Sequence, residues 1–184
     1  MQLFKNNSHL NTWTIEKAKE GDRRAQKAIY DSLSEKMFAV CLRYMGERSA
    51  AEDVLQDGFV TLFAKLDTFS GEGSFEGWAR KIFVNTALMN LRRNDVLKDT
   101  EDVSEARSIS SEAPSAVQDL SYKELCAMIS SLPPGFRTVF NMYVIEGYAH
   151  NEIASALGIS EGTSRSQLLR AKAMLQAKIL ERKK

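Results

Sequence analysis

The chain has 184 residues, of which 43% are hydrophobic and 27% are charged, and its formal net charge is +1. These values are typical of globular proteins with one or two domains, and they exclude collagen-like, wholly disordered and membrane-spanning classes. The apolar runs are too short to cross a bilayer and the first residues lack a secretory signal pattern, so we expect a cytoplasmic protein without membrane insertion.

The predicted fold class is all-α, because only three prolines and ten glycines interrupt the chain and few segments alternate with a period of two. Charge divides the chain into three parts. Residues 1–94 have a net charge of +2, residues 95–120 of −5 and residues 121–184 of +4. The acidic middle part is rich in serine and poor in aromatic residues, so it cannot form a core. We therefore predict two small helical domains joined by an acidic flexible linker.

The first domain contains clear signals for the ends of helices. Asp22 can cap a helix that runs to Gly46, where glycine tolerates the left-handed conformation that ends a helix. Ser49 and Glu52 then have the S-x-x-E spacing of a capping box. This spacing predicts that a second helix begins there.

That second helix has an apolar side and an acidic side. Residues spaced by three and four positions form its apolar stripe, namely Leu55, Phe59, Leu62 and Leu66. Asp53, Gln56 and Asp57 lie off this stripe. Taken alone, these three residues are interpreted as a solvated face, and a partner-binding surface is the alternative.

A glycine-rich loop and a helix without acidic residues follow. From Gly77 to Asn94 every charged residue is basic, and aromatic rings are interspersed, which suits binding of single-stranded nucleic acid. At about 100° per residue, one side of this helix carries Trp78, Ile82, Asn85 and Met89. We therefore expect Trp78 to lie in the core. The amide of Asn85 would need a partner, either backbone groups of the fold or a base edge.

The second domain is predicted to open with another capping box, formed by Ser121 and Glu124. Pro133 and Pro134 interrupt the first helix of this domain, because proline cannot continue a helix. The next helix should run from about residue 135 to residue 146.

A helix-turn-helix pattern follows. A short helix ends at Gly158, Ile159 packs inward and Ser160 caps a longer helix. The predicted buried side of the longer helix consists of Leu168, Ala171, Leu175 and Ile179, and its opposite side carries Thr163, Ser166 and Arg170. From residue 162 onward there are seven basic residues and one acidic residue. This charge suits a recognition helix that approaches phosphates and base edges in the major groove of DNA.

Three segments in this order resemble the extracytoplasmic-function (ECF) group of bacterial RNA polymerase sigma factors. They are AEDVLQDGFVTLFAKLDTF, SGEGSFEGWARKIFVNTALMNLRR and SLPPGFRTVFNMYVIEGYAHNEIASALGISEGTSRSQLLRAKAML. The resemblance implies that residues 1–94 are sigma region 2, which binds the β′ coiled coil of polymerase and recognises and melts the minus-ten promoter element. It implies that residues 121–184 are sigma region 4, which binds the β flap and recognises the minus-thirty-five element.

The resemblance also implies roles for single residues. The positions that match the polymerase-binding helix are Asp53, Gln56 and Asp57. Those that match the capture of a base flipped out of the non-template strand are Lys65, Phe69, Ser74, Phe75 and Asn85. Those that match the contacts to the upstream element are Thr163, Arg165, Ser166, Leu169 and Arg170.

Three residues depart from the family pattern. Ala149 replaces a capping Ser or Thr, which should forgo a cap of about 1 kcal/mol. Ser164 replaces an inward-packing valine and should loosen the recognition helix. Gln167 replaces an arginine and should remove one phosphate contact.

The partners implied are RNA polymerase core, promoter DNA in duplex and single-stranded form, and an anti-sigma factor, without a small-molecule substrate. We do not expect an enzyme, a cofactor or a metal site, because His9, His150, Cys41 and Cys126 form no catalytic or metal-binding pattern. The alternative function is a helix-turn-helix transcriptional regulator that never enters polymerase and binds a palindrome as a dimer.

Overall fold

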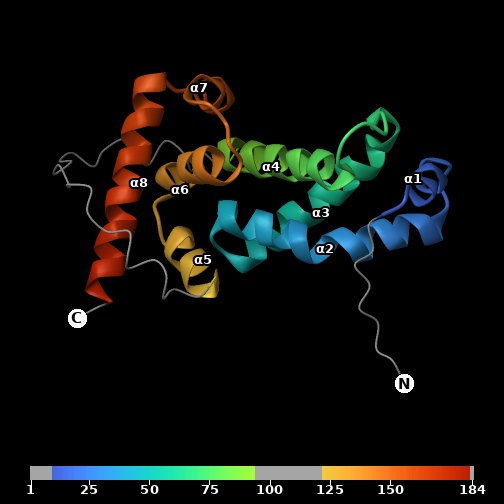
Figure 1. Ribbon diagram of the computed structural model, residues 1–184, viewed down its shortest axis with the longest axis horizontal. Coiled ribbons are helices and arrows are strands. Elements are labelled where there is room, and N and C mark those ends of the chain that lie inside the picture. Colours follow the sequence, from blue (N-terminus) through green and yellow to red (C-terminus); the bar gives the residue numbers. More distant parts are fainter. Residues whose placement is uncertain (1–9, 94–121, 183–184) are drawn as a thin grey trace.

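In the computed structural model of the protein, residues 10–93 and 122–182 are described (Figure 1). They form eight α-helices and contain no β-strand, which confirms the all-α prediction. No helix in these two ranges is long and apolar enough to cross a membrane, and no group of side chains there could hold a metal ion. The predictions for the linker, for the Ser121 capping box and for His9 lie outside the described residues.

The first bundle consists of four α-helices and one short 3₁₀ helix: α1 (Thr12–Lys19), α2 (Arg23–Met45), α3 (Arg48–Ala64), the 3₁₀ helix (Leu66–Thr68) and α4 (Phe75–Arg93). α2 is central and contacts α1, α3 and α4. The predicted ends of α2 are confirmed. The Asp22 carboxylate accepts hydrogen bonds from the backbone N–H groups of Arg24 and Ala25, and Gly46 has a φ of 78°.

The predicted capping box at the start of α3 is wrong. The helix begins at Arg48, and Ser49 lies in its first turn, where its hydroxyl donates to the Glu47 carboxylate at 2.7 Å. Glu52 pairs with Arg48 at 2.8 Å instead of reaching back to the backbone. Because Gly46 ends α2, only Glu47 remains as an extended residue, and α3 starts before Ser49 can cap it.

The apolar stripe of α3 is confirmed, with Phe59, Leu62 and Leu66 buried and Leu55 half-buried. α3 and α4 approach each other closely at Gly58. A Cβ added there would lie 2.3 Å from the ring of Phe83, so only glycine fits. This close approach sets the distance between the buried sides of α3 and α4.

The second bundle consists of α5 (Tyr122–Ser130), α6 (Pro134–Phe140), a π-helical turn (Asn141–Ile145), α7 (His150–Leu157) and α8 (Glu161–Glu181). The two prolines separate α5 from α6 as predicted, with Pro134 in the first turn, where its missing N–H costs nothing. The π-turn continues α6 directly, so the predicted helix up to residue 146 has an irregular last turn.

The helix-turn-helix prediction is confirmed. α7 ends at Gly158, which has a φ of 69°, and the Ser160 hydroxyl accepts a hydrogen bond from the Thr163 N–H at 3.0 Å. Leu168 and Ala171 are buried on the inner side of α8.

Ser160→Ala should destabilise the protein by about 1 kcal/mol, because the Thr163 N–H loses its acceptor at the start of α8. Urea denaturation followed by circular dichroism measures this change. Ser155→Ala, at an exposed position within α7, is the control and should change stability little. Equal stability of Ser160→Ala and the wild type would contradict the capping role.

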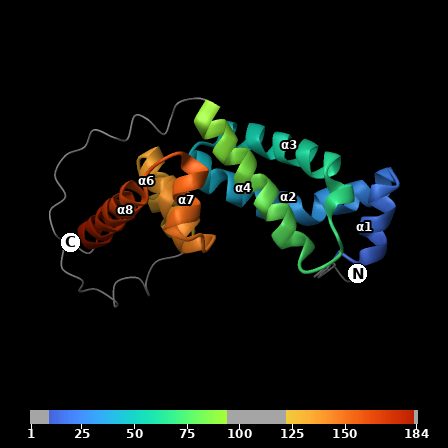
Figure 2. The same ribbon diagram turned by 90° about the horizontal axis from the view of Figure 1, so that it is seen from above.

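The two bundles pack directly on each other. α2 contacts α5 and α6, and the apolar core of the first bundle continues without interruption into Val139, Met142, Ile153 and Leu168. Figure 2 shows the second bundle at one end of the first, far from α1. The two helical units therefore share one core in this structure.

The thiol of Cys41 is fully buried in α2, and burial raises the pKa of Cys41 to about 12. It is therefore protonated at pH 8 and shielded from reagents. We expect a thiol reagent such as DTNB to titrate one thiol per folded chain, that of the half-buried Cys126, and two in denaturant. Rapid reaction of both thiols in the folded chain would contradict this burial.

Candidate nucleic-acid and polymerase interfaces

An open groove of about 560 Å³ lies between α3 and α4. It contains two residues of the predicted base-binding site, Lys65 at the end of α3 and Asn85 on α4. The Asn85 side chain is exposed and hydrogen-bonds to no described residue. This favours a partner from outside over backbone groups of the fold. Arg92 and Arg93 add positive charge at one end of the groove.

The predicted base-binding aromatic residues lie elsewhere. Phe69 and Phe75 are buried, with ring centroids 5.1 Å apart, and each lies 5.4 Å from the half-buried ring of Trp78. None of the three lines the groove. Ser74 is exposed, and its hydroxyl accepts a hydrogen bond from the Gly77 N–H at 3.2 Å, so it caps α4. The aromatic cluster therefore anchors the loop between the 3₁₀ helix and α4.

Trp78 packs against the apolar core, as expected, but its side of α4 is not buried as far as Met89. Met89 is 69% exposed, and this side of the helix faces the groove. The buried side of α4 consists instead of Phe75, Ala79, Phe83, Val84, Ala87, Leu88 and Leu91. The small side chains of Ala79 and Ala87 allow α4 to approach its neighbours, which selects that side for the core.

The acidic side of α3 is exposed, as its position off the apolar stripe predicts. Asp53, Gln56 and Asp57 all face solvent within the described structure. Asp57 also lines the groove that contains Lys65 and Asn85. The structure therefore brings one predicted polymerase-binding residue next to the predicted base-binding site.

The recognition helix α8 presents a basic surface. Arg165, Ser166 and Leu169 are exposed, whereas Thr163 and Arg170 are half-buried. Arg165 pairs with Glu161 at 2.6 Å. Arg170 forms no hydrogen bond or ion pair with any described residue, so its guanidinium is available to a ligand.

Two of the departures from the family pattern have structural compensation. Ser164 is fully buried, and its hydroxyl lies 2.8 Å from Nδ1 of His150, which begins α7. This hydrogen bond joins the two helices of the helix-turn-helix where apolar packing was expected. At Ala149 the Glu152 carboxylate accepts a hydrogen bond from the backbone N–H at 2.7 Å, which partly replaces the missing cap. Gln167 is buried, so it is not positioned as an exposed phosphate contact.

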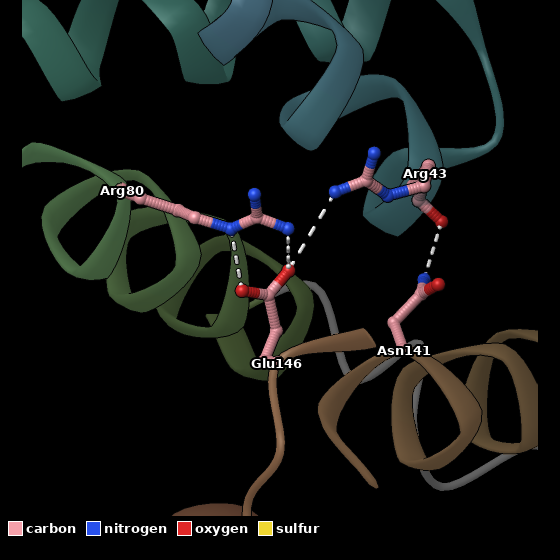
Figure 3. A network of polar contacts seen from close by, with 4 residues as sticks. All are labelled: Arg43, Arg80, Asn141 and Glu146. Carbon is pink, nitrogen blue, oxygen red and sulfur yellow. Dashed lines mark hydrogen bonds and ion pairs between the residues drawn. The ribbon is translucent and has the colours of Figure 1, made fainter. Parts of the chain in front are cut away.

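Five polar side chains connect the two bundles, and we call them the interdomain polar network: Arg43, Arg80, Arg137, Asn141 and Glu146 (Figure 3 shows four of them). Arg80 binds the Glu146 carboxylate through two hydrogen bonds of 2.6 and 2.9 Å. This pairing raises the pKa of Arg80. Asn141 donates to the backbone carbonyl of Arg43 at 2.8 Å.

Arg137 is the most buried guanidinium of this network, and burial lowers the pKa of Arg137. It donates to four backbone carbonyls, those of Tyr44 and Met45 at the end of α2, that of Ser130 at the end of α5 and that of Leu132 just after it. A Cβ at Gly46 would lie 2.6 Å from this guanidinium. The end of α2 is therefore shaped to receive Arg137.

Sequence reasoning missed the interdomain polar network entirely. Arg80 and Glu146 are 66 positions apart, and Arg137 and Tyr44 are 93 apart. No local periodicity relates residues at such separations. Glu146 itself gives no signal in the sequence, because it is one of five acidic residues in the second domain.

Comparison with known proteins agrees with this geometry. Residues 29–96 match the family model described as Sigma-70 region 2, and residues 122–175 match the model described as Sigma-70, region 4. The two matches follow each other in order and together cover about two thirds of the chain. The chain therefore belongs to the sigma-70 family, and it is a sigma factor, the kind of DNA-binding protein that directs RNA polymerase to promoters.

Within this family several of the relatives are named ECF sigma factors. The chain is 25% identical over 176 residues to the ECF RNA polymerase sigma-E factor of Haemophilus influenzae. The alignment covers 90% of this chain and 93% of that protein. It is 25% identical over 169 residues to the RNA polymerase sigma-H factor of Pseudomonas aeruginosa, with 86% and 88% covered. The protein is thus an ECF sigma factor.

A solved structure shares the fold. The sigma factor RpoE, in complex with the anti-sigma factor NepR from Bartonella quintana, aligns with a TM-score of 0.50 and 21% identity. The alignment covers 84% of this chain and 96% of that one. The alternative of a regulator that acts outside polymerase is not favoured, because residues 29–96 match a sigma region.

Proposed function

We propose that this sigma factor binds RNA polymerase core and initiates transcription by recognising two promoter elements with separate helical domains. Residues 1–94 would bind polymerase and open the minus-ten element, and residues 121–184 would recognise the minus-thirty-five element. Residues 95–120 would link them. The observation that carries this proposal is the ordered match of sigma regions 2 and 4 to the two helical bundles. The mechanism contains no catalytic step by this chain.

In the downstream site, we assign capture of the flipped base to Lys65 and Asn85, and support of this site to Phe69, Ser74 and Phe75. The groove beside Lys65 and Asn85 offers a cation for phosphate and an amide for a base edge. Phe69 and Phe75 would hold the intervening loop in place, and Ser74 would fix the start of α4.

In the upstream site, we assign DNA contacts to Thr163, Arg165, Ser166, Leu169 and Arg170. The arginines can bind guanine edges or phosphates, and Leu169, which is 62% exposed, offers an apolar contact to a thymine methyl group. The Arg165 pair with Glu161 is exposed, so it can exchange for a DNA contact at small cost.

For polymerase binding, we assign Asp53, Gln56 and Asp57 to the β′ coiled coil and the second bundle to the β flap. Asp53, Gln56 and Asp57 share an exposed face of α3, which supports their assignment to the β′ coiled coil. We further propose a cytoplasmic location and control by an anti-sigma factor, by analogy with the complex of RpoE and NepR.

The proposal is tested by purification of the protein with RNA polymerase core, followed by run-off transcription on genomic fragments of the source organism. We expect the two to co-elute and to start transcripts at discrete sites that share an upstream and a downstream element. Dimeric binding to a palindrome without association with polymerase would support the alternative regulator and refute this function.

Asn85→Ala should slow promoter opening while duplex binding by α8 stays unchanged, because the groove loses the amide that would hold the displaced base. Permanganate reactivity of promoter thymines measures the opened strand. Asn151→Ala, at an exposed position on α7, is the matched control. Unaltered thymine reactivity in Asn85→Ala would refute the assigned role.

A further inference from the structure

The inner side of α8 contains few large apolar residues where it meets α7. The buried residues of this helix are Ser164, Gln167, Leu168 and Ala171, so only Leu168 offers a large apolar surface. Figure 1 shows α7 beside the N-terminal end of α8. Apolar packing alone therefore restrains the rotation of this end of α8 only weakly.

A hydrogen bond to α7 supplies a further restraint. Ser164 is 0% exposed, and its hydroxyl lies 2.8 Å from Nδ1 of His150, the first residue of α7. This hydroxyl has no other hydrogen-bond partner among the described residues. Because a buried hydroxyl without a partner is costly, the native orientation of α8 is the one that keeps Ser164 on His150. An apolar side chain at this position would impose no such direction, since hydrophobic packing is non-directional.

The imidazole ring of His150 is held by a second contact. It stacks on the ring of Tyr143, with centroids 4.5 Å apart and planes inclined by 23°. Tyr143 belongs to the π-turn that continues α6, so it lies outside the helix-turn-helix. The stacking restricts rotation of the imidazole. The two contacts therefore run from Tyr143 through His150 to Ser164 and fix α8 relative to the end of α6.

The rotation of α8 matters because Ser164 lies between two residues that we assign to DNA, Thr163 and Arg165. The ends of side chains lie roughly 6 Å from the axis of a helix, so a rotation of about 20° moves them by about 2 Å. A binding site tolerates displacements of only about 0.5 Å from its productive geometry. A small rotation of α8 would therefore disturb contacts between its arginines and base edges.

We propose that His150 is a positioning residue for promoter recognition. Its hydrogen bond to Ser164 fixes the rotation of α8 and so determines which base edges Arg165 and Arg170 reach. His150 acts through Ser164 and not by contact with DNA. This inference rests on the proposed function and deepens it, because it names a residue outside α8 that governs specificity at the upstream site. Loss of the bond leaves the positive charge of α8 intact, so the effect falls on sequence discrimination and not on phosphate binding.

The first experiment measures discrimination by the holoenzyme of the full-length chain. Anisotropy titrations at fixed salt concentration give the dissociation constants for scrambled DNA and for a promoter fragment found by run-off transcription, and their ratio is the readout. His150→Phe keeps a ring that can stack on Tyr143 but has no hydrogen-bonding nitrogen. We expect it to lower the ratio about tenfold, with little change on scrambled DNA.

Two further variants identify the cause of this loss. His150→Asn has an amide that can reach the Ser164 hydroxyl, so its ratio should stay within about threefold of the wild type. Asn151→Ala, at the exposed neighbouring position, is the control and should leave the ratio unchanged. An unchanged ratio in His150→Phe would overturn the inference. So would equal losses on both DNAs, or a loss in His150→Asn as large as that in His150→Phe.

The second experiment tests the contact without polymerase. His150→Phe and Ser164→Val are combined in a double-mutant cycle, and urea titration of the free chain gives the unfolding equilibrium constants. If the hydrogen bond holds α8, the second substitution should change this constant about fivefold less when the first is present. Independent effects of the two substitutions would overturn the inference. Failure of the wild-type chain to join polymerase core or to start transcripts refutes instead the proposed function, whatever the result of the cycle.

Discussion

Arg137→Ala is expected to destabilise the protein by about 3 to 5 kcal/mol, the largest effect of any single substitution considered. The guanidinium is 6% exposed and satisfies four backbone carbonyls at distances of 2.8 to 3.0 Å. Its removal leaves these acceptors buried around a cavity. The free energy of unfolding from urea titration, followed by circular dichroism, measures the loss.

Two further variants sharpen this test. Arg137→Lys should recover only part of the stability, because one ammonium group cannot reach carbonyls in four directions. Arg24→Ala, at an exposed position at the start of α2, should change stability by less than about 0.5 kcal/mol. A loss of less than about 1 kcal/mol in Arg137→Ala would show that water replaces the guanidinium at little cost.

Arg170→Ala is expected to weaken binding of the holoenzyme to its upstream element by about 1 to 3 kcal/mol and to relax specificity at one base pair. Arg170 has no hydrogen-bond or ion-pair partner among the described residues, so no polar folding contact is lost with it. Anisotropy titration with a fluorescent promoter fragment, at fixed salt concentration, measures the affinity.

The specificity of this loss separates base recognition from phosphate binding. Lys172→Ala, at an exposed position two residues further along α8, should weaken binding equally on promoter and scrambled DNA. Equal losses on both DNAs for Arg170→Ala would assign this residue to phosphate as well. Whether Arg170 recognises a base or binds phosphate, the melting temperature of the Arg170→Ala protein should equal that of the wild type.

The sequence by itself determined most of the helices, several of their ends and the helix-turn-helix. Asp22, Gly46, Gly158 and Ser160 act through neighbours within a few residues, so their effects can be read locally. The apolar stripe of α3 was predictable because its residues are only three or four positions apart. The three segments that resemble sigma factors also identified the family, because each motif is continuous in the sequence.

Tertiary structure decided which side of α4 is buried and how the two bundles meet. Both sides of α4 contain large apolar residues, so periodicity alone could not choose, and the close contact of Gly58 with Phe83 selected the buried side. The partners of Arg137 and Glu146 lie 66 or more positions away in the first bundle. Such contacts follow from the packing of whole helices, and no pattern within a single helix encodes them.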